Sequence, residues 1–245
     1  MKKIILITGA NRGLGLETAL QLGKLGHIII AAAREQLKAD QTTENLQAQG
    51  VVAHALKLDV TSQNDIANAY TFIDDSFGKL DVLVNNAGVQ LDFPAFMPGN
   101  NSTDITGDVL RNTFETNYFA PILLTKQLLP LLKKSMAGRI VNVPSIMGSM
   151  ALHSDPGSPI YGIKLLAYNS SKTALNQYTI HLAEAFKDTP IKVNSAHPGW
   201  VKTALGGEYA PMESPEGAKT IVDLCLIDAN GPNGAFIHLG ESLSW

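Results

Sequence analysis

The chain has 245 residues, of which 45% are hydrophobic and 17% charged, and its formal net charge is −3. A net charge near zero, without runs of like charge, excludes the electrostatic pattern of proteins that bind nucleic acid or anionic lipid. The single cysteine, Cys225, cannot form an internal disulfide, and no apolar stretch approaches the roughly 18 residues that span a bilayer. We therefore expect a cytoplasmic protein without nucleic-acid or membrane partners.

Short apolar runs alternate with longer amphipathic segments along the whole chain. The runs are apolar at consecutive positions, as expected of strands buried on both faces of a parallel sheet. They cover residues 4–7, 28–32, 51–56, 82–84, 140–143, 191–194 and 236–238. Apolar residues at helical spacing mark residues 14–25, 36–49, 64–77, 110–134 and 167–186. This alternation predicts a Rossmann-like, doubly wound parallel α/β sheet with helices on both faces, and the lack of a linker predicts a single domain over residues 1–245.

A glycine-rich turn follows the first predicted strand and opens the first predicted helix. It reads Gly9-Ala10-Asn11-Arg12-Gly13-Leu14-Gly15. Glycines let backbone N–H groups approach a pyrophosphate, which the positive end of a helix also favours. The spacing G-x-x-x-G-x-G departs from the usual G-x-G-x-x-G, so an ordinary strand–helix turn is the alternative. The strand–turn–helix context favours dinucleotide binding.

The end of the second predicted strand indicates which dinucleotide binds. An acid there suits the ribose 2′-hydroxyl of NAD, whereas an arginine suits the 2′-phosphate of NADP. The strand ends at Arg34, and Arg12 in the glycine-rich turn could reach the same phosphate from the other side. Glu35 is the competing signal, and we interpret it as a first-turn acid that complements the helix dipole. NADP(H) is therefore favoured over NAD(H).

Two further strand ends carry polar or small residues. Asp59 and Val60 follow the third strand, and Asn86, Ala87 and Gly88 follow the fourth. Taken singly, each set is explained by turn chemistry, because Asp, Asn and Gly suit strand ends. Ligands of open α/β sheets bind beyond the carboxyl ends of the strands, so the irregular segments there are expected to frame the site. These segments are residues 91–106, 147–163 and 202–216, the last of them a short substrate lid.

Tyr168 and Lys172 lie four residues apart at the start of a strongly periodic helix, so their side chains project from one face. A nearby ammonium stabilises a phenolate and brings a tyrosine closer to general acid/base work at neutral pH. Such a pair also occurs by chance on solvated faces. A second pair, Tyr161 and Lys164, is disfavoured because Gly162 between them and Pro159 before them oppose a helix.

Two polar residues could complete the site. Ser145 closes the fifth predicted strand, where a hydroxyl can bind a substrate carbonyl oxygen, although a simple turn serine is the alternative. Asn117 lies in mid-helix, where asparagine is a poor helix former, so it either serves a polar network or faces solvent. The scattered histidines show no metal-ligand spacing, so no metal is expected. No G-x-S-x-G nucleophile motif occurs, which disfavours an α/β hydrolase.

Together these motifs resemble the short-chain dehydrogenase/reductase family, in its compact branch of carbonyl-reductase-like members. The resemblance rests on residues 8–15, 59, 86–88, 117, 145, 168, 172 and 197–203. It implies a tetrad with Tyr168 as general acid/base, Ser145 orienting the carbonyl, Lys172 binding the nicotinamide ribose, and Asn117 holding a water. It also implies that the cofactor contacts Tyr168 as well as Lys172. The nicotinamide pocket would be lined by Pro198, Gly199, Val201 and Thr203.

The chain departs from the family pattern in two places. Ser145 and Tyr168 are 23 residues apart, a wider spacing than in many members, so residues 147–163 carry an insertion at the mouth of the site. Pro144 stands where the family often has a small or polar residue, and it should stiffen the turn. The insertion leaves the substrate and the oligomeric state (monomer, dimer or tetramer) open.

The expected activity is NADPH-dependent reduction of a ketone or aldehyde, or the reverse oxidation of the alcohol, with a small molecule as the substrate. Two alternatives remain. A catalytically silent dinucleotide sensor would use the fold for binding alone, but such proteins usually lose the tyrosine or the lysine. A 3-oxoacyl-thioester reductase would share the chemistry and differ in the substrate.

Overall fold

A computed structural model of the chain describes residues 2–93 and 100–245. The core is one eight-stranded sheet with the strand order β3-β2-β1-β4-β5-β6-β7-β8. Strands β1 to β7 are parallel and β8 runs antiparallel to β7. The strands are β1 (Ile4–Ile7), β2 (Ile28–Ala33), β3 (Val52–Lys57), β4 (Val82–Asn85), β5 (Arg139–Asn142), β6 (Lys192–Ala196), β7 (Phe236–His238) and β8 (Glu241–Ser242).

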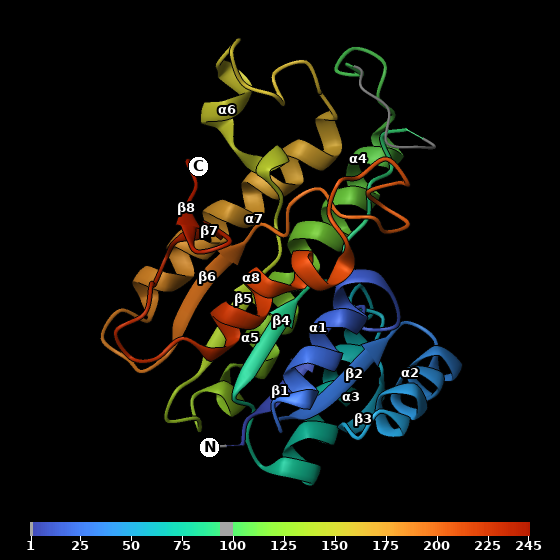
Figure 1. The fold of residues 1–245 in the computed structure, drawn as a ribbon, viewed down its shortest axis with the longest axis vertical. Helices are drawn as coiled ribbons and strands as arrows, with labels where there is room; N and C mark the ends of the chain where they lie inside the picture. The colour runs from blue at the N-terminus through green and yellow to red at the C-terminus, as the bar shows by residue number, and fades with distance from the viewer. Residues whose placement is uncertain (1, 94–99) are drawn as a thin grey trace.

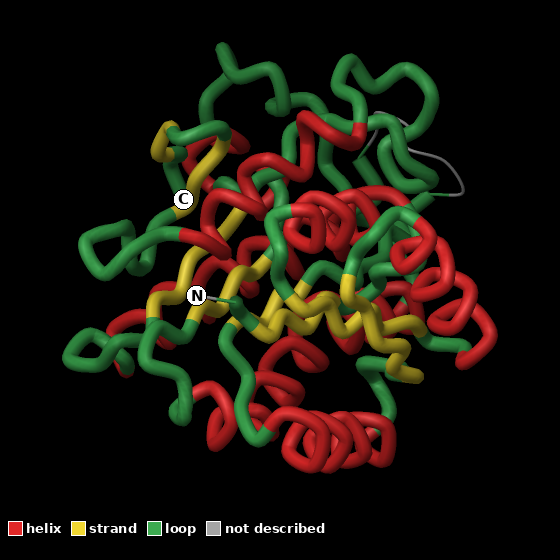
Figure 2. The backbone as a smooth tube through the Cα atoms, turned by 60° about the horizontal axis from the view of Figure 1, so that its bottom comes forward, coloured by secondary structure: helices red, strands yellow, loops and turns green. Residues whose placement is uncertain are grey.

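Helices cover both faces of this sheet, which Figure 2 shows as a layer of strands between helices. The helical elements are α1 (Gly13–Lys24), α2 (Gln36–Ala48), α3 (Gln63–Phe77), α4 (Gly107–Phe114), η1 (Glu115–Phe119), α5 (Ala120–Leu132), η2 (Ile146–Gly148), α6 (Met150–Ser154), α7 (Leu166–Ala185) and α8 (Ser214–Leu226). The doubly wound α/β fold expected from the sequence is confirmed.

The two cores explain why the strands are apolar at consecutive positions. Along β1, Ile4 and Leu6 pack into one core with α3, α5 and α7. Ile5 and Ile7 pack into the other core with α1, α2 and α8. Alternate side chains of a strand point to opposite faces, so a sheet covered on both faces needs an apolar residue at every position.

The loops after the strands gather at one end of the molecule. Figure 1 shows α6 and the starts of α4 and α7 at this end, with the N-terminus at the opposite end. Because every strand from β1 to β7 points the same way, the carboxyl ends of the strands and the residues that follow them lie along one edge.

Several details differ from the sequence-based expectation. The helix predicted over residues 110–134 is three successive elements, with the π-turn η1 between α4 and α5. The segment 147–163 is not wholly irregular, since it contains α6, and α8 begins inside the segment 202–216. Glu35 precedes α2 as its N-cap residue and makes no side-chain cap, so it does not lie in the first turn. In the described part of the chain, none of the helices has the length and apolar character needed to span a membrane.

Candidate active site

Helix α7 and the end of β5 bring three of the four tetrad candidates together. Tyr168 is 5% exposed and its hydroxyl hydrogen-bonds with the side chain of Ser145, the N-cap residue of η2. The Lys172 ammonium, one helical turn after Tyr168, lies 5.6 Å from the centre of the tyrosine ring. It donates a hydrogen bond to the carbonyl oxygen of Val143 at 3.0 Å. The i, i+4 spacing thus places both side chains beside the loop that carries Ser145.

Burial sets the protonation of this pair. It raises the pKa of Tyr168 to about 12, against the lowering effect of the hydrogen bond with Ser145. The sequence pairing with Lys172 predicts a lowered tyrosine pKa, whereas burial raises the pKa of Tyr168 in the structure. Burial also lowers the pKa of Lys172 to about 8. Near pH 7, the Tyr168 hydroxyl is therefore protonated and lies beside a lysine that is mostly charged.

Asn117 is fully buried in the π-turn η1, so the solvent-facing alternative is wrong. Its Oδ1 accepts from the Val89 N–H at 2.8 Å, and its Nδ2 donates to the Val89 carbonyl at 2.8 Å and to the Ser171 hydroxyl at 3.0 Å. The π-turn is a local widening of the helix, a feature often found at functional sites. A Cβ added to Gly88 would lie 3.3 Å from both Asn117 Oδ1 and Lys172 Nζ, so Asn117, Lys172 and the turn after β4 converge.

The glycine-rich turn packs against the end of β4. Gly9 adopts a positive φ of 63°, and a Cβ on Gly15 would lie 2.3 Å from the Gly9 carbonyl oxygen and 2.6 Å from Asn86 Nδ2. Asn86 Nδ2 donates to the Thr8 carbonyl at 2.8 Å, and the Thr8 hydroxyl accepts from the N–H groups of Asn86 and Ala87 at 3.0 Å each. Thr8 was not among the predicted site residues, although its place at the end of β1 signals this role.

Helix α1 begins in this turn and leaves its first N–H groups available. Arg12 is its N-cap residue and makes no side-chain cap. The first main-chain bond of the helix runs from the Leu16 N–H to the Arg12 carbonyl, so the N–H groups of residues 13–15 precede the helical ladder. A Cβ on Gly13 would lie 3.2 Å from Thr203 Cγ2, which places the segment after β6 beside the turn. Asn11 is half-buried in the same turn.

The remaining cofactor candidates lie along the same edge of the sheet. Arg12 and Arg34 are exposed, and Arg34 follows β2. Asp59 and Val60 follow β3, where Asp59 accepts from the N–H and hydroxyl of Thr61 at 3.0 and 2.7 Å. The turn chemistry proposed for Asp59 is therefore present.

The loop after β6 is held by His197, which was not predicted as a site residue. Its Nδ1 accepts from the N–H of Ile146 at 3.2 Å and from that of Gly199 at 3.4 Å. Burial, reinforced by His238, lowers the pKa of His197 to about 3, so the ring is a neutral acceptor. Pro198 and Val201 are buried, and Gly199 has a φ of 89° with Met212 packed against its Cα.

The second tyrosine–lysine pair lies outside this arrangement. Tyr161 is 42% exposed and lies in a turn, as its glycine and proline neighbours predict. Lys164 Nζ lies 4.6 Å from the centre of the Tyr161 ring and donates to the His153 carbonyl at 2.8 Å. Tyr161 and Lys164 thus contact each other, and Lys164 also contacts His153 within the insertion.

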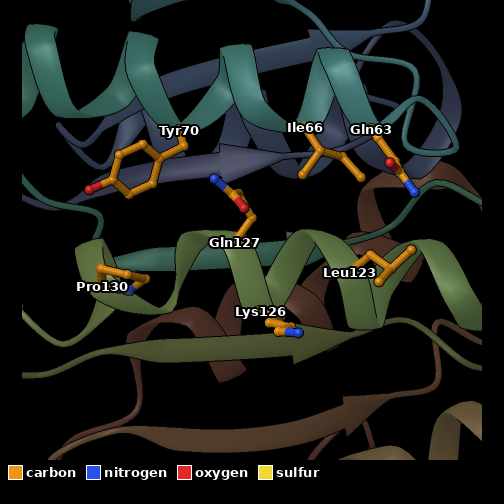
Figure 3. Close-up of a pocket in the computed structure, with 7 residues that line it drawn as sticks. All are labelled: Gln63, Ile66, Tyr70, Leu123, Lys126, Gln127 and Pro130. Atoms are coloured by element: carbon orange, nitrogen blue, oxygen red, sulfur yellow. The ribbon is translucent and has the colours of Figure 1, made fainter.

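A separate groove of about 520 Å³ lies between α3 and α5. Figure 3 shows side chains of the two helices facing each other across it. It is lined by Gln63, Ile66, Tyr70, Leu123, Lys126, Gln127 and Pro130, none of which is a predicted site residue. Among residues 2–93 and 100–245, no cluster of three or more His, Cys, Asp or Glu side chains could hold a metal ion.

A model of the short chain dehydrogenase family matches residues 3–214. The chain therefore belongs to this family, which defines it as an oxidoreductase. It is 36% identical over 231 residues to the short-chain dehydrogenase anuI of Penicillium roqueforti (strain FM164), covering 90% of this chain and 87% of that one.

Other relatives share nearly the full length. The chain is 30% identical over 281 residues to carbonyl reductase (NADPH) 1 of Homo sapiens, covering 99% of this chain and 98% of that one. The crystal structure of NADPH-bound carbonyl reductase from chicken fatty liver superposes with a TM-score of 0.85 at 27% identity, covering 100% of this chain and 99% of that chain.

Proposed function

We propose that this protein is an NADPH-dependent carbonyl reductase that reduces a ketone or aldehyde of a small molecule, or oxidises the corresponding alcohol. The observation that carries the proposal is the hydrogen bond between Tyr168 and Ser145, with Lys172 one helical turn away. A neutral phenol beside a second hydroxyl is what a carbonyl oxygen needs when it takes up a proton.

The cofactor site is supported by the shape of the glycine-rich turn. Side chains at positions 9, 13 and 15 would fill the space beside Asn86, Ala87 and Thr203, and the unpaired N–H groups at the start of α1 suit a pyrophosphate. Arg12 and Arg34 would hold the 2′-phosphate that distinguishes NADPH from NADH, since no acid terminates β2. Two of the relatives are NADPH carbonyl reductases by name, which agrees with this choice. Residues 59, 60, 86–88, 198, 199, 201 and 203 would line the rest of the cofactor site.

When bound, NADPH would supply the hydride for the carbonyl carbon. The residues of this chain would donate the proton, orient the carbonyl group and bind the cofactor. Tyr168 donates its hydroxyl proton to the carbonyl oxygen, and Ser145 orients that oxygen toward Tyr168. Lys172 would hold the nicotinamide ribose, and its charge stabilises the phenolate left on Tyr168. Asn117 would hold a water through which the proton is replaced. Its Oδ1 accepts one hydrogen bond from Val89, which leaves a second lone pair, and both this oxygen and Lys172 Nζ lie beside Gly88.

An assay of NADPH oxidation with a panel of activated ketones, aldehydes and acyl thioesters tests the proposal. Oxidation with simple carbonyl compounds supports it. Oxidation of NADPH with 3-oxoacyl thioesters alone would instead favour the 3-oxoacyl-thioester reductase. Tight NADPH binding without oxidation across the panel would favour the sensor. We expect residues 147–163 and 202–216 to frame the carbonyl-binding site, so substrates differing in size on either side of the carbonyl should be included.

A further inference from the structure

Helix α7, which carries Tyr168 and Lys172, begins without a capping residue of its own. The first N–H groups of a helix have no partner within the helix. The N-cap residue here is Leu165, whose side chain cannot accept a hydrogen bond. The acceptors come instead from the loop that follows β4, more than 60 residues earlier in the chain.

Asp92 provides two of these acceptors. Its Oδ1 accepts from the Ala167 N–H at 2.8 Å, and its Oδ2 accepts from the Tyr168 N–H at 2.9 Å. Asn101 provides the third, since its Oδ1 accepts from the Leu166 N–H at 3.0 Å. Asn101 Nδ2 also donates to Asp92 Oδ1 at 3.1 Å, which ties the two side chains together. Three successive N–H groups of the first turn are thus capped from one loop.

The same loop also touches Lys172 and Asn117, two other residues of the tetrad. The space beside Gly88 is bounded by Lys172 Nζ, and the backbone of Val89 holds both ends of the Asn117 amide. Asp92 then holds the backbone of Tyr168. Phe93 packs against the apolar cluster that includes Tyr168. A stretch of six residues therefore contacts three tetrad residues.

Resting on the proposed function, we propose that Asp92 is a positioning residue for Tyr168: its carboxylate seats the first turn of α7 so that the tyrosine hydroxyl meets Ser145. The carboxylate binds the backbone of the acid/base residue itself, and this role requires no contact with the substrate. Small displacements of a catalytic group cost rate steeply, so the loss of this cap should act on turnover more than on binding.

The test compares Asp92→Ala and Asp92→Asn with Asp104→Asn. Asp104 is an exposed acid near Asn101, so its variant removes the same charge without removing the cap. We expect Asp92→Ala to lower kcat roughly tenfold or more while the KM for NADPH stays within about twofold. Asp92→Asn keeps one acceptor oxygen and should fall between the wild type and Asp92→Ala. Asp104→Asn should match the wild type.

A second readout follows amide hydrogen exchange at Ala167 and Tyr168 in the protein without substrate. We expect faster exchange at these two amides in Asp92→Ala, with unchanged exchange in the β1 and β4 strands. Unchanged exchange at both amides, or faster exchange with wild-type kcat, would overturn the proposal. Because exchange needs no turnover, a wild type inactive on every carbonyl would count against the proposed function, while exchange would still decide whether Asp92 caps the helix. Failure of Asp92→Ala to fold would leave Asp92→Asn to decide by the same two measurements.

Discussion

Asn117 and Val89 hold each other through a pair of hydrogen bonds, each 2.8 Å long, so that one side-chain amide satisfies both backbone groups of one residue. This pairing gives Asn117 a structural role, beside the chemical role proposed for it. It also fixes the backbone at Val89. The neighbouring residues Gly88 and Asp92 then contact Lys172 and Tyr168.

Replacing Asn117 by Ala should destabilise the fold by about 2–3 kcal/mol, because the Val89 N–H and carbonyl would lose their partners inside the protein. The free energy of unfolding, measured by urea denaturation, checks this. Asn112→Ala is the matched control, an exposed asparagine in the preceding helix α4, and should change stability by less than about 0.5 kcal/mol. Equal stability of the two variants would show that the Val89 pairing contributes nothing.

Gly15→Ala should both destabilise the protein and weaken cofactor binding. The added methyl would lie 2.3 Å from the Gly9 carbonyl oxygen, so the glycine-rich turn would have to move. Forced overpacking of this kind costs about 1–3 kcal/mol. The control is Gly162→Ala, where nothing lies within 4 Å of the new methyl. Thermal unfolding with and without NADPH measures both effects, and a Gly15→Ala variant that behaves like Gly162→Ala would contradict the packing argument.

Arg34→Ala should raise the KM for NADPH by about tenfold, because a charge-assisted hydrogen bond to the 2′-phosphate is lost. The KM for NADH should change little, since NADH has no 2′-phosphate. Arg111→Ala removes an exposed arginine that pairs with Asp108 and serves as the control for charge alone. Parallel losses for both cofactors in Arg34→Ala would count against the NADPH assignment.

His197 should make the stability of the protein depend on pH. Its pKa is lowered from 6.5 to about 3 in the folded state, so unfolding takes up a proton below pH 6.5. Stability from this group is therefore present above pH 6.5 and lost as the pH falls. Between pH 7 and pH 5 the loss should be about 2 kcal/mol. Urea denaturation across this range should show a smaller loss in His197→Asn, and identical slopes for the two proteins would rule out this role.

The sheet could be predicted because its strands are buried on both faces and are therefore apolar throughout. The pairing of Tyr168 with Lys172 was also accessible, since it depends only on helical spacing. The π-turn at Asn117 was not, because the spacing of apolar residues does not distinguish a widened turn from regular helix. The bond from Ile146 to His197 joins residues 51 apart, and no local pattern records it.

The cap on α7 illustrates the same limit. The Asp92 contact with the Tyr168 N–H spans 76 residues, and an acid in a loop looks like any solvated side chain. Such contacts depend on how the loop after β4 packs against the start of α7 at the edge of the sheet. Sequence patterns predict which loops lie at that edge, but not which side chains bind across it.

Tyr168 is the proposed proton donor, and the turnover of Tyr168→Phe with NADPH and an activated carbonyl compound tests this role most directly. We predict that kcat falls by at least about a thousandfold while the Kd for NADPH stays close to that of the wild type. Phenylalanine keeps the buried ring and removes only the hydroxyl, so folding should be retained. Wild-type-like turnover in this variant would contradict the mechanism.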